Sequence, residues 1–169
     1  MASLPSVLLI MGVAGAGKST YGEALAAEFG WPFRDADSFH PEANIIKMKS
    51  GTPLTDDDRW PWLDAIAGWI DAHRTAGTHG IVTCSALKRI YRQRLTAGRD
   101  DVRLVYLKGD KALIAKRMAA RTDHFMPTAL LDSQFATLEE PDAGEWPVVV
   151  AVDGSPRRVK ERILAELAG

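Results

Sequence analysis

Residues 12–19 read Gly12-Val13-Ala14-Gly15-Ala16-Gly17-Lys18-Ser19 and match the pattern G-x-x-x-x-G-K-[ST] at every fixed position. Glycines allow a backbone to wrap closely around phosphate oxygens with its N–H groups turned inward. In this pattern the lysine reaches the β- and γ-phosphates, and the serine hydroxyl can coordinate Mg²⁺. The stretch therefore predicts a binding site for a nucleoside triphosphate.

The residues on either side of this loop support the prediction. The apolar run 7–11 is typical of a buried strand, and residues 20–29 are typical of a helix. A loop between them lies at a helix N-terminus, where the helix dipole favours phosphate. We therefore expect the nucleotide to contact Gly12, Val13, Ala14, Gly15, Ala16, Gly17, Lys18, Ser19 and Thr20.

The rest of the chain alternates apolar, β-rich runs with helical patterns. Further strands are expected at residues 32–34, 81–84, 102–107 and 148–152, and helices at 58–76, 88–97, 111–120 and 157–167. Two of these runs lack polar alternation, which is typical of a parallel sheet covered on both faces. The pattern predicts a three-layer α/β fold built on a parallel sheet.

Two regions interrupt this alternation within what we expect to be a single domain spanning residues 1–169. Short helices are expected in them, near 43–48 and 128–137. In a nucleotide-using α/β fold, a substrate-binding insertion (about 38–57) and a closing lid (about 118–127) are natural interpretations. The alternative is that both regions only decorate the surface.

Composition excludes several classes of function. The 169 residues carry 21 basic and 22 acidic side chains, so no global charge points to nucleic acid or to a membrane surface. No apolar run is long enough to span a bilayer, and no basic-then-apolar leader is present. The single cysteine, Cys84, excludes an internal disulfide and is expected to be a small buried side chain. We expect a cytoplasmic protein without nucleic-acid or membrane partners.

Two carboxylates follow the second expected strand, at Asp35 and Asp37. Residues i and i+2 of an extended segment point to the same side, and a strand's carboxyl end faces the ligand crevice of such folds. We assign Asp37 to the attacking hydroxyl, as proton acceptor, and Asp35 to Mg²⁺-bound water or to substrate. The alternative is that the pair only opens a turn.

Basic residues at the ends of elements are the other candidates. Arg59 lies near the N-terminus of the helix expected at 58–76, where a cation is unfavourable. Its partner is either a neighbouring aspartate or a substrate carboxylate. Lys88 begins the next helix beside the crevice, unless it is simply solvated. Arg117 and Arg121 share one helix face, and a lid arginine could stabilise the transferring phosphate; a solvated face is the alternative.

The chain resembles the bacterial-type gluconate kinases over nearly its whole length. The phosphate loop is shared by many families, but Phe39-His40-Pro41, Asp58-Arg59 and Ser133-Gln134-Phe135 are far more specific. Further matching stretches are 51–54, 84–88, 106–110 and His124-Phe125-Met126-Pro127. One departure is Ala36, where many relatives carry glycine between the two aspartates.

This resemblance implies a phosphate-loop kinase fold like that of shikimate and adenylate kinases. It also implies ATP- and Mg²⁺-dependent phosphorylation of D-gluconate on its 6-hydroxyl, and a homodimer. The implied substrate-binding residues are Asp37, His40, Lys47, Arg59, Lys88 and His124, the implied catalytic residues are Lys18, Asp37, Arg117 and Arg121, and Ser19 with Asp35 would hold the metal. For His40, a purely structural role is the alternative.

Two rival functions are weighed against this one. The first is another small-molecule kinase of the same fold, of the shikimate or nucleoside monophosphate type. The second is a GTP-hydrolysing switch, for which Lys108-Gly109-Asp110 imitates part of a guanine-reading motif. Leu107 replaces the asparagine of that motif, and no D-x-x-G element occurs in the chain, so the switch is disfavoured.

Overall fold

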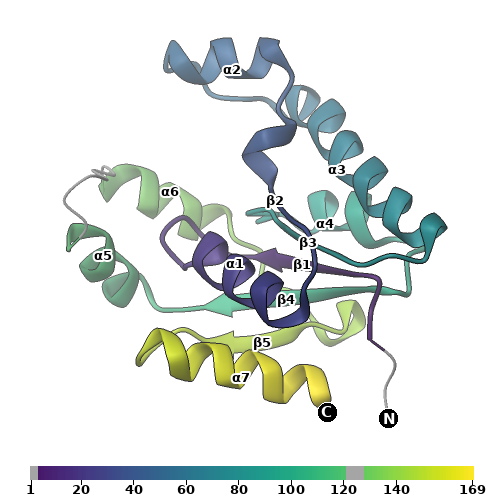
Figure 1. The fold of residues 1–169 in the computed structure, drawn as a ribbon. Helices are drawn as coiled ribbons and strands as arrows, with labels where there is room; N and C mark the ends of the chain where they lie inside the picture. Colours follow the sequence, from purple (N-terminus) through teal and green to yellow (C-terminus); the bar gives the residue numbers. More distant parts are fainter. Residues whose placement is uncertain (1–3, 121–127) are drawn as a thin grey trace.

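The computed structural model describes residues 4–120 and 128–169, which contain one sheet of five parallel strands. Its spatial order is β2-β3-β1-β4-β5, which places β1 at the centre (Figure 1). The strands are β1 (Val7–Met11), β2 (Phe33–Asp35), β3 (Gly80–Thr83), β4 (Val102–Lys108) and β5 (Val148–Ala151).

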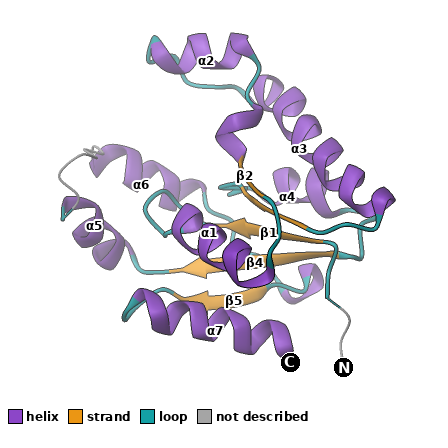
Figure 2. Ribbon diagram, viewed as in Figure 1, coloured by secondary structure: helices purple, strands orange, loops and turns teal. Residues whose placement is uncertain are grey.

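Helices cover both faces of the sheet (Figure 2). The α-helices are α1 (Lys18–Phe29), α2 (Glu42–Lys49), α3 (Asp56–Ala76), α4 (Arg89–Thr96), α5 (Lys111–Ala119), α6 (Thr128–Thr137) and α7 (Pro156–Ala168). Two short 3₁₀ helices, η1 (Ala36–Phe39) and η2 (Ala143–Glu145), complete the described elements. None of the helices in the described ranges has both the length and the apolar content needed to cross a bilayer.

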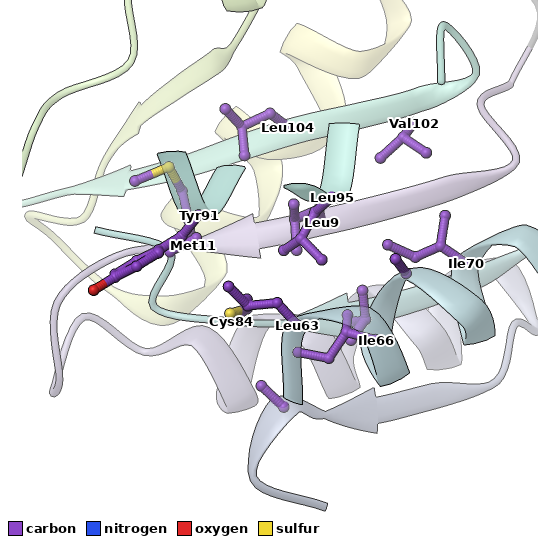
Figure 3. Packing of buried hydrophobic residues seen from close by; sticks show 14 of the residues in the cluster. Leu9, Met11, Leu63, Ile66, Ile70, Cys84, Tyr91, Leu95, Val102 and Leu104 are labelled. Atoms are coloured by element: carbon purple, nitrogen blue, oxygen red, sulfur yellow. The ribbon is translucent and has the colours of Figure 1, made fainter. Parts of the chain in front are cut away.

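The core divides into two clusters because successive residues of β1 point to opposite faces. Leu8 and Ile10 are fully buried in one cluster with side chains of α1, α5 and α7. Leu9 and Met11 are fully buried in the other, where α3 and α4 cover the sheet (Figure 3). The predicted three-layer α/β fold with a parallel sheet is therefore confirmed.

The carboxyl ends of the central strands lie at one level. Thr83 of β3 is the register partner of both Ile10 of β1 and Asp35 of β2. The phosphate loop, the Asp35–Asp37 segment and residues 84–88 therefore emerge from the same edge of the sheet. The inserted helix α2 projects beyond this edge, away from the strands (Figure 1).

The predicted strands differ from the observed ones by at most one residue at either end. The long helix α3 begins at Asp56, two residues before the predicted start, because Thr55 and Asp58 form a capping box. The Asp58 N–H donates to Thr55 Oγ1 (3.1 Å), and the Thr55 N–H donates to Asp58 Oδ2 (2.9 Å). The 3₁₀ turn η1 was not predicted. It is capped by the Asp35 carboxylate, which accepts the Asp37 N–H (3.0 Å).

Candidate active site

The phosphate loop adopts a backbone path that glycine makes possible. Gly17 precedes α1 with φ of 97°, and Gly15 has φ of 83°. A Cβ atom would lie 2.7 Å from the Tyr21 ring at the first position and 2.7 Å from Met118 Sδ at the second. Because α1 begins at Lys18, the free N–H groups of its first turn face the loop. The loop thus has the glycine-dependent backbone path that the sequence pattern predicts, and its binding of phosphate stays a prediction.

Lys18 folds back over the loop. Its Nζ donates to the carbonyl oxygens of Gly12 (2.9 Å) and Val13 (3.1 Å). Burial lowers the pKa of Lys18, and the carboxylates of Asp35 and Asp37 are close enough to oppose that shift. The structure thus brings the predicted lysine and both predicted carboxylates into one site.

Ser19 and Asp35 form the pair that was predicted to hold the metal. Ser19 Oγ donates to Asp35 Oδ2 at 2.7 Å, beside the first turn of α1. Within the described residues, no three His, Cys, Asp or Glu side chains gather into a metal-binding cluster. Mg²⁺ usually keeps several waters and takes one or two protein ligands together with substrate phosphates. One hydroxyl and one carboxylate at a phosphate loop fit that ion.

A cavity of about 380 Å³ lies next to the loop, because its lining residue Gln134 accepts the backbone N–H of Ala14. Its volume is within the range of small-molecule sites. Exposed Asp37 lies on its wall, together with the predicted substrate residues His40, Arg59 and Lys88. The remaining lining residues are Met48, Leu54, Trp62, Ser85, Ala86, Leu87, Tyr91, Ser133, Gln134 and Thr137.

One part of this wall concentrates positive charge. Lys88 Nζ lies 3.6 Å and Arg59 Nη1 lies 3.8 Å from the Asp56 carboxylate. The Tyr91 hydroxyl donates to the same carboxylate, and this bond lowers the pKa of Asp56. Two cations thus share one ionised aspartate, which leaves a net positive charge suited to an anionic ligand. Both partners considered for Arg59, the neighbouring aspartate and a ligand in the cavity, are compatible with this position.

His40 is held against the cavity by stacking. Its ring lies 4.3 Å from the Trp62 ring at an interplanar angle of 11°, and its Nδ1 lies 3.3 Å from Asn44 Nδ2. Burial lowers the pKa of His40 from its usual 6.5, which favours the neutral imidazole. A neutral imidazole can exchange hydrogen bonds with a sugar hydroxyl.

Two predicted residues have other partners. Lys47 does not line the cavity; its Nζ donates to both carboxylate oxygens of Asp58 (2.8 and 3.0 Å). Arg117 donates to the carbonyl oxygens of Val152 and Gly154, and it lines a smaller cavity of about 170 Å³ together with residues 15–17 of the phosphate loop. The predicted Arg121 and His124 lie outside the described residues.

Cys84 is buried, and burial raises its pKa to about 12. The expectation of a small buried side chain is confirmed.

Comparisons with known proteins agree with this geometry. The chain is 41% identical over 160 residues to the gluconokinase of Gluconobacter oxydans, covering 95% of this chain and 90% of that protein. It also superposes on the crystal structure of a gluconokinase from Sinorhizobium meliloti 1021 with a TM-score of 0.86 and 42% identity, covering 99% of this chain and 94% of the other.

The chain belongs to the gluconokinase family. Residues 7–141 also match the wider family described as AAA domain. The shikimate kinase of Aquifex aeolicus superposes with a TM-score of 0.60 at 16% identity, covering 96% of each chain, which shows a shared fold. The family resemblance and the kinase fold predicted from the sequence are therefore confirmed.

Several residues that line this gluconokinase-family cavity have no role that was predicted from the sequence. Tyr91 follows Lys88 by three positions, and that spacing on a helix could have placed both on one face. Ser133, Gln134 and Thr137 come from α6, and they reach the cavity only through the tertiary fold.

Proposed function

We propose that the chain transfers the γ-phosphoryl group of ATP to the 6-hydroxyl of D-gluconate, giving 6-phospho-D-gluconate and ADP. The gluconokinases that match it at 41–42% identity over nearly its whole length support this activity. The observation that carries the proposal is the cavity beside the phosphate loop, with Asp37 on its wall and the Arg59–Lys88 cations within it.

The distribution of charge supports one orientation of the sugar acid. Its carboxylate binds near Arg59 and Lys88, where the cations outnumber the single Asp56. Charge-assisted bonds of a guanidinium to a carboxylate are stronger than neutral ones. Neutral His40 binds a hydroxyl of the chain, and the 6-hydroxyl then lies toward Asp37 and the phosphate loop.

Asp37 aligns this hydroxyl and accepts its proton. The hydroxyl oxygen forms a bond to the γ-phosphorus as the bond from that phosphorus to the β,γ-bridging oxygen breaks. The electron pair of the broken bond stays on ADP, and the proton of the hydroxyl passes to the Asp37 carboxylate.

Lys18 and the backbone N–H groups at the start of α1 hold the phosphates of ATP in this proposal, whereas the N–H groups of Ala14 and Ala16 already bond to Gln134 and to the Val13 carbonyl. Ser19, with Asp35 acting through water, would hold Mg²⁺, which neutralises phosphate charge when bound. Arg117, which lines the smaller cavity with Gly15 and Thr20, and Arg121 are the proposed catalytic arginines, and His124 is a proposed substrate-binding residue. Lys47 supports the cavity through Asp58.

The remaining expectations complete the proposal. They are a substrate-binding insertion at about 38–57, a lid at about 118–127 within one domain, a homodimeric assembly and a cytoplasmic location. No nucleic acid or membrane takes part in the proposed reaction.

The replacement Asp37→Asn tests the proposed base. Loss of a general base is expected to lower kcat by about 10²- to 10⁴-fold, while ADP affinity is retained. Coupled ADP release measures the rate, and calorimetry measures ADP binding. Asp57→Asn, at an exposed position in the first turn of α3, is the matched control and should behave like the wild type. A near-normal kcat in Asp37→Asn would remove Asp37 from this role.

A further inference from the structure

The side chain of Gln134 connects α6 to the phosphate loop. Its Oε1 accepts the backbone N–H of Ala14 at 2.6 Å, across 120 positions of sequence. Figure 2 shows α6 beside the loop that joins β1 to α1. Ala14 is the third residue of the loop that we expect to surround the phosphates, so Gln134 holds the backbone of the nucleotide site itself.

The same side chain lines the acceptor cavity, together with Asp37, Arg59 and Lys88. Gln134 therefore contacts both halves of the site: the loop that holds the phosphoryl donor and the cavity for its acceptor.

The segment just after α6 is anchored beside Leu87 and Lys88, which line the same cavity. The Glu139 N–H donates to the Leu87 carbonyl (2.8 Å), and the Glu139 carboxylate accepts the N–H of Arg89 (2.8 Å). Leu131 is buried in the core on the other side of Gln134. Leu131 and the Glu139 contacts fix α6 on either side of Gln134. The Gln134 carboxamide therefore holds the phosphate loop at a set distance from the cavity wall.

We propose that Gln134 is a positioning residue for phosphoryl transfer, which sets the distance between the phosphate loop and the acceptor cavity through its bond to Ala14. The proposal rests on the gluconokinase activity of the chain. A displacement of about 1 Å between reacting groups can cost about 10²-fold in rate. Loss of the bond therefore affects transfer more than it affects the binding of either substrate.

Two variants separate positioning from a general loss of structure. Gln134→Met keeps the length of the side chain and removes the acceptor oxygen. We expect kcat with gluconate to fall about 10- to 100-fold, while KM for gluconate and Kd for ADP change by less than about threefold. Gln134→Glu keeps an acceptor for the Ala14 N–H but places a negative charge beside the loop. We expect it to retain more kcat than Gln134→Met and to weaken ATP binding more than ADP binding.

Gln93→Met is the matched control, because Gln93 is exposed on α4 and does not line the acceptor cavity. Unfolding midpoints of all variants report on folding. An unchanged kcat in Gln134→Met, or a fall in ADP affinity as large as the fall in kcat, would overturn the proposal. So would equal effects of Gln134→Glu on ATP and ADP binding. If the wild type and Gln93→Met both fail to phosphorylate gluconate, it is the proposed function that fails.

Discussion

The burial of Arg92 determines how much stability its replacement should cost. Its guanidinium is fully buried on α4 and donates to both carboxylate oxygens of Glu145 (2.7 and 3.2 Å). It also donates to the carbonyl oxygens of Ala86 (2.9 Å) and Leu87 (3.2 Å). Ala86 has φ of 46°, in the left-handed region, and lines the cavity. Arg92 therefore holds a strained part of the cavity wall in place.

The replacement Arg92→Met puts an unbranched apolar side chain in place of the arginine and removes all of its hydrogen-bond donors. Breaking a buried ion pair by removing one partner costs about 3–5 kcal/mol, because the remaining charge is left unpaired. Glu145 keeps 11% exposure, so water can reach it in part and the lower end of this range applies. A loss of about 3 kcal/mol corresponds to a fall in Tm of about 6–12 °C for a domain of this size.

Arg94→Met on the same helix is the matched control. Arg94 makes a similar two-bond pair with Asp64 (2.7 and 3.0 Å), but the two side chains are 48% and 53% exposed. Exposed pairs contribute about 0–1 kcal/mol. Urea unfolding followed by tryptophan fluorescence gives both free energies. Adding Glu145→Gln to Arg92→Met should restore part of the loss, because it removes the unpaired charge. Equal losses in Arg92→Met and Arg94→Met would refute the reasoning.

Two further predictions concern the cavity. NMR titration of His40 should give a midpoint below its usual 6.5, because burial disfavours the imidazolium more than Asp37 favours it, and Arg59 adds to the shift. Because the folded-state pKa is lowered, the unfolded chain binds the His40 proton more tightly than the folded chain does. The free energy of unfolding should therefore fall more steeply below pH 6.5 in the wild type than in His40→Gln. An NMR midpoint of His40 above 6.5 would contradict this. Arg59→Gln should raise KM for gluconate about 10- to 100-fold, with a smaller change in kcat, because a charge-assisted bond is worth about 1.5–3 kcal/mol. An unchanged KM would limit Arg59 to its contacts within the chain, with Asp56, the Leu54 carbonyl and the Tyr91 hydroxyl.

Local patterns were enough to predict the parts of the site that local chemistry determines. The phosphate loop could be predicted because glycines, a lysine and a serine at this fixed spacing are specific for phosphate-binding loops. Asp35 could be placed because the carboxyl end of a strand in a parallel sheet faces the ligand crevice. The alternation of an extended strand did not place Asp37, which lies in the turn η1 that Asp35 caps, so the turn weighed as the alternative is present as well.

The contacts that could not be predicted depend on how distant elements pack. Lys47 forms its ion pair with Asp58 only because the tertiary fold brings α2 close to the start of α3. Arg92 has the sequence context of an ordinary helix arginine, and its burial depends on Glu145 of η2. The bond of Gln134 to Ala14 spans most of the chain, and no local pattern indicates it.

The most direct measurement incubates the purified chain with ATP, Mg²⁺ and, in parallel, D-gluconate, shikimate or a nucleoside monophosphate. Release of ADP gives the rate, and ³¹P and ¹³C NMR identify the phosphorylated oxygen. The account predicts rapid turnover with gluconate alone and a phosphomonoester on carbon 6. Turnover of shikimate or the nucleotide with gluconate left unchanged would contradict it.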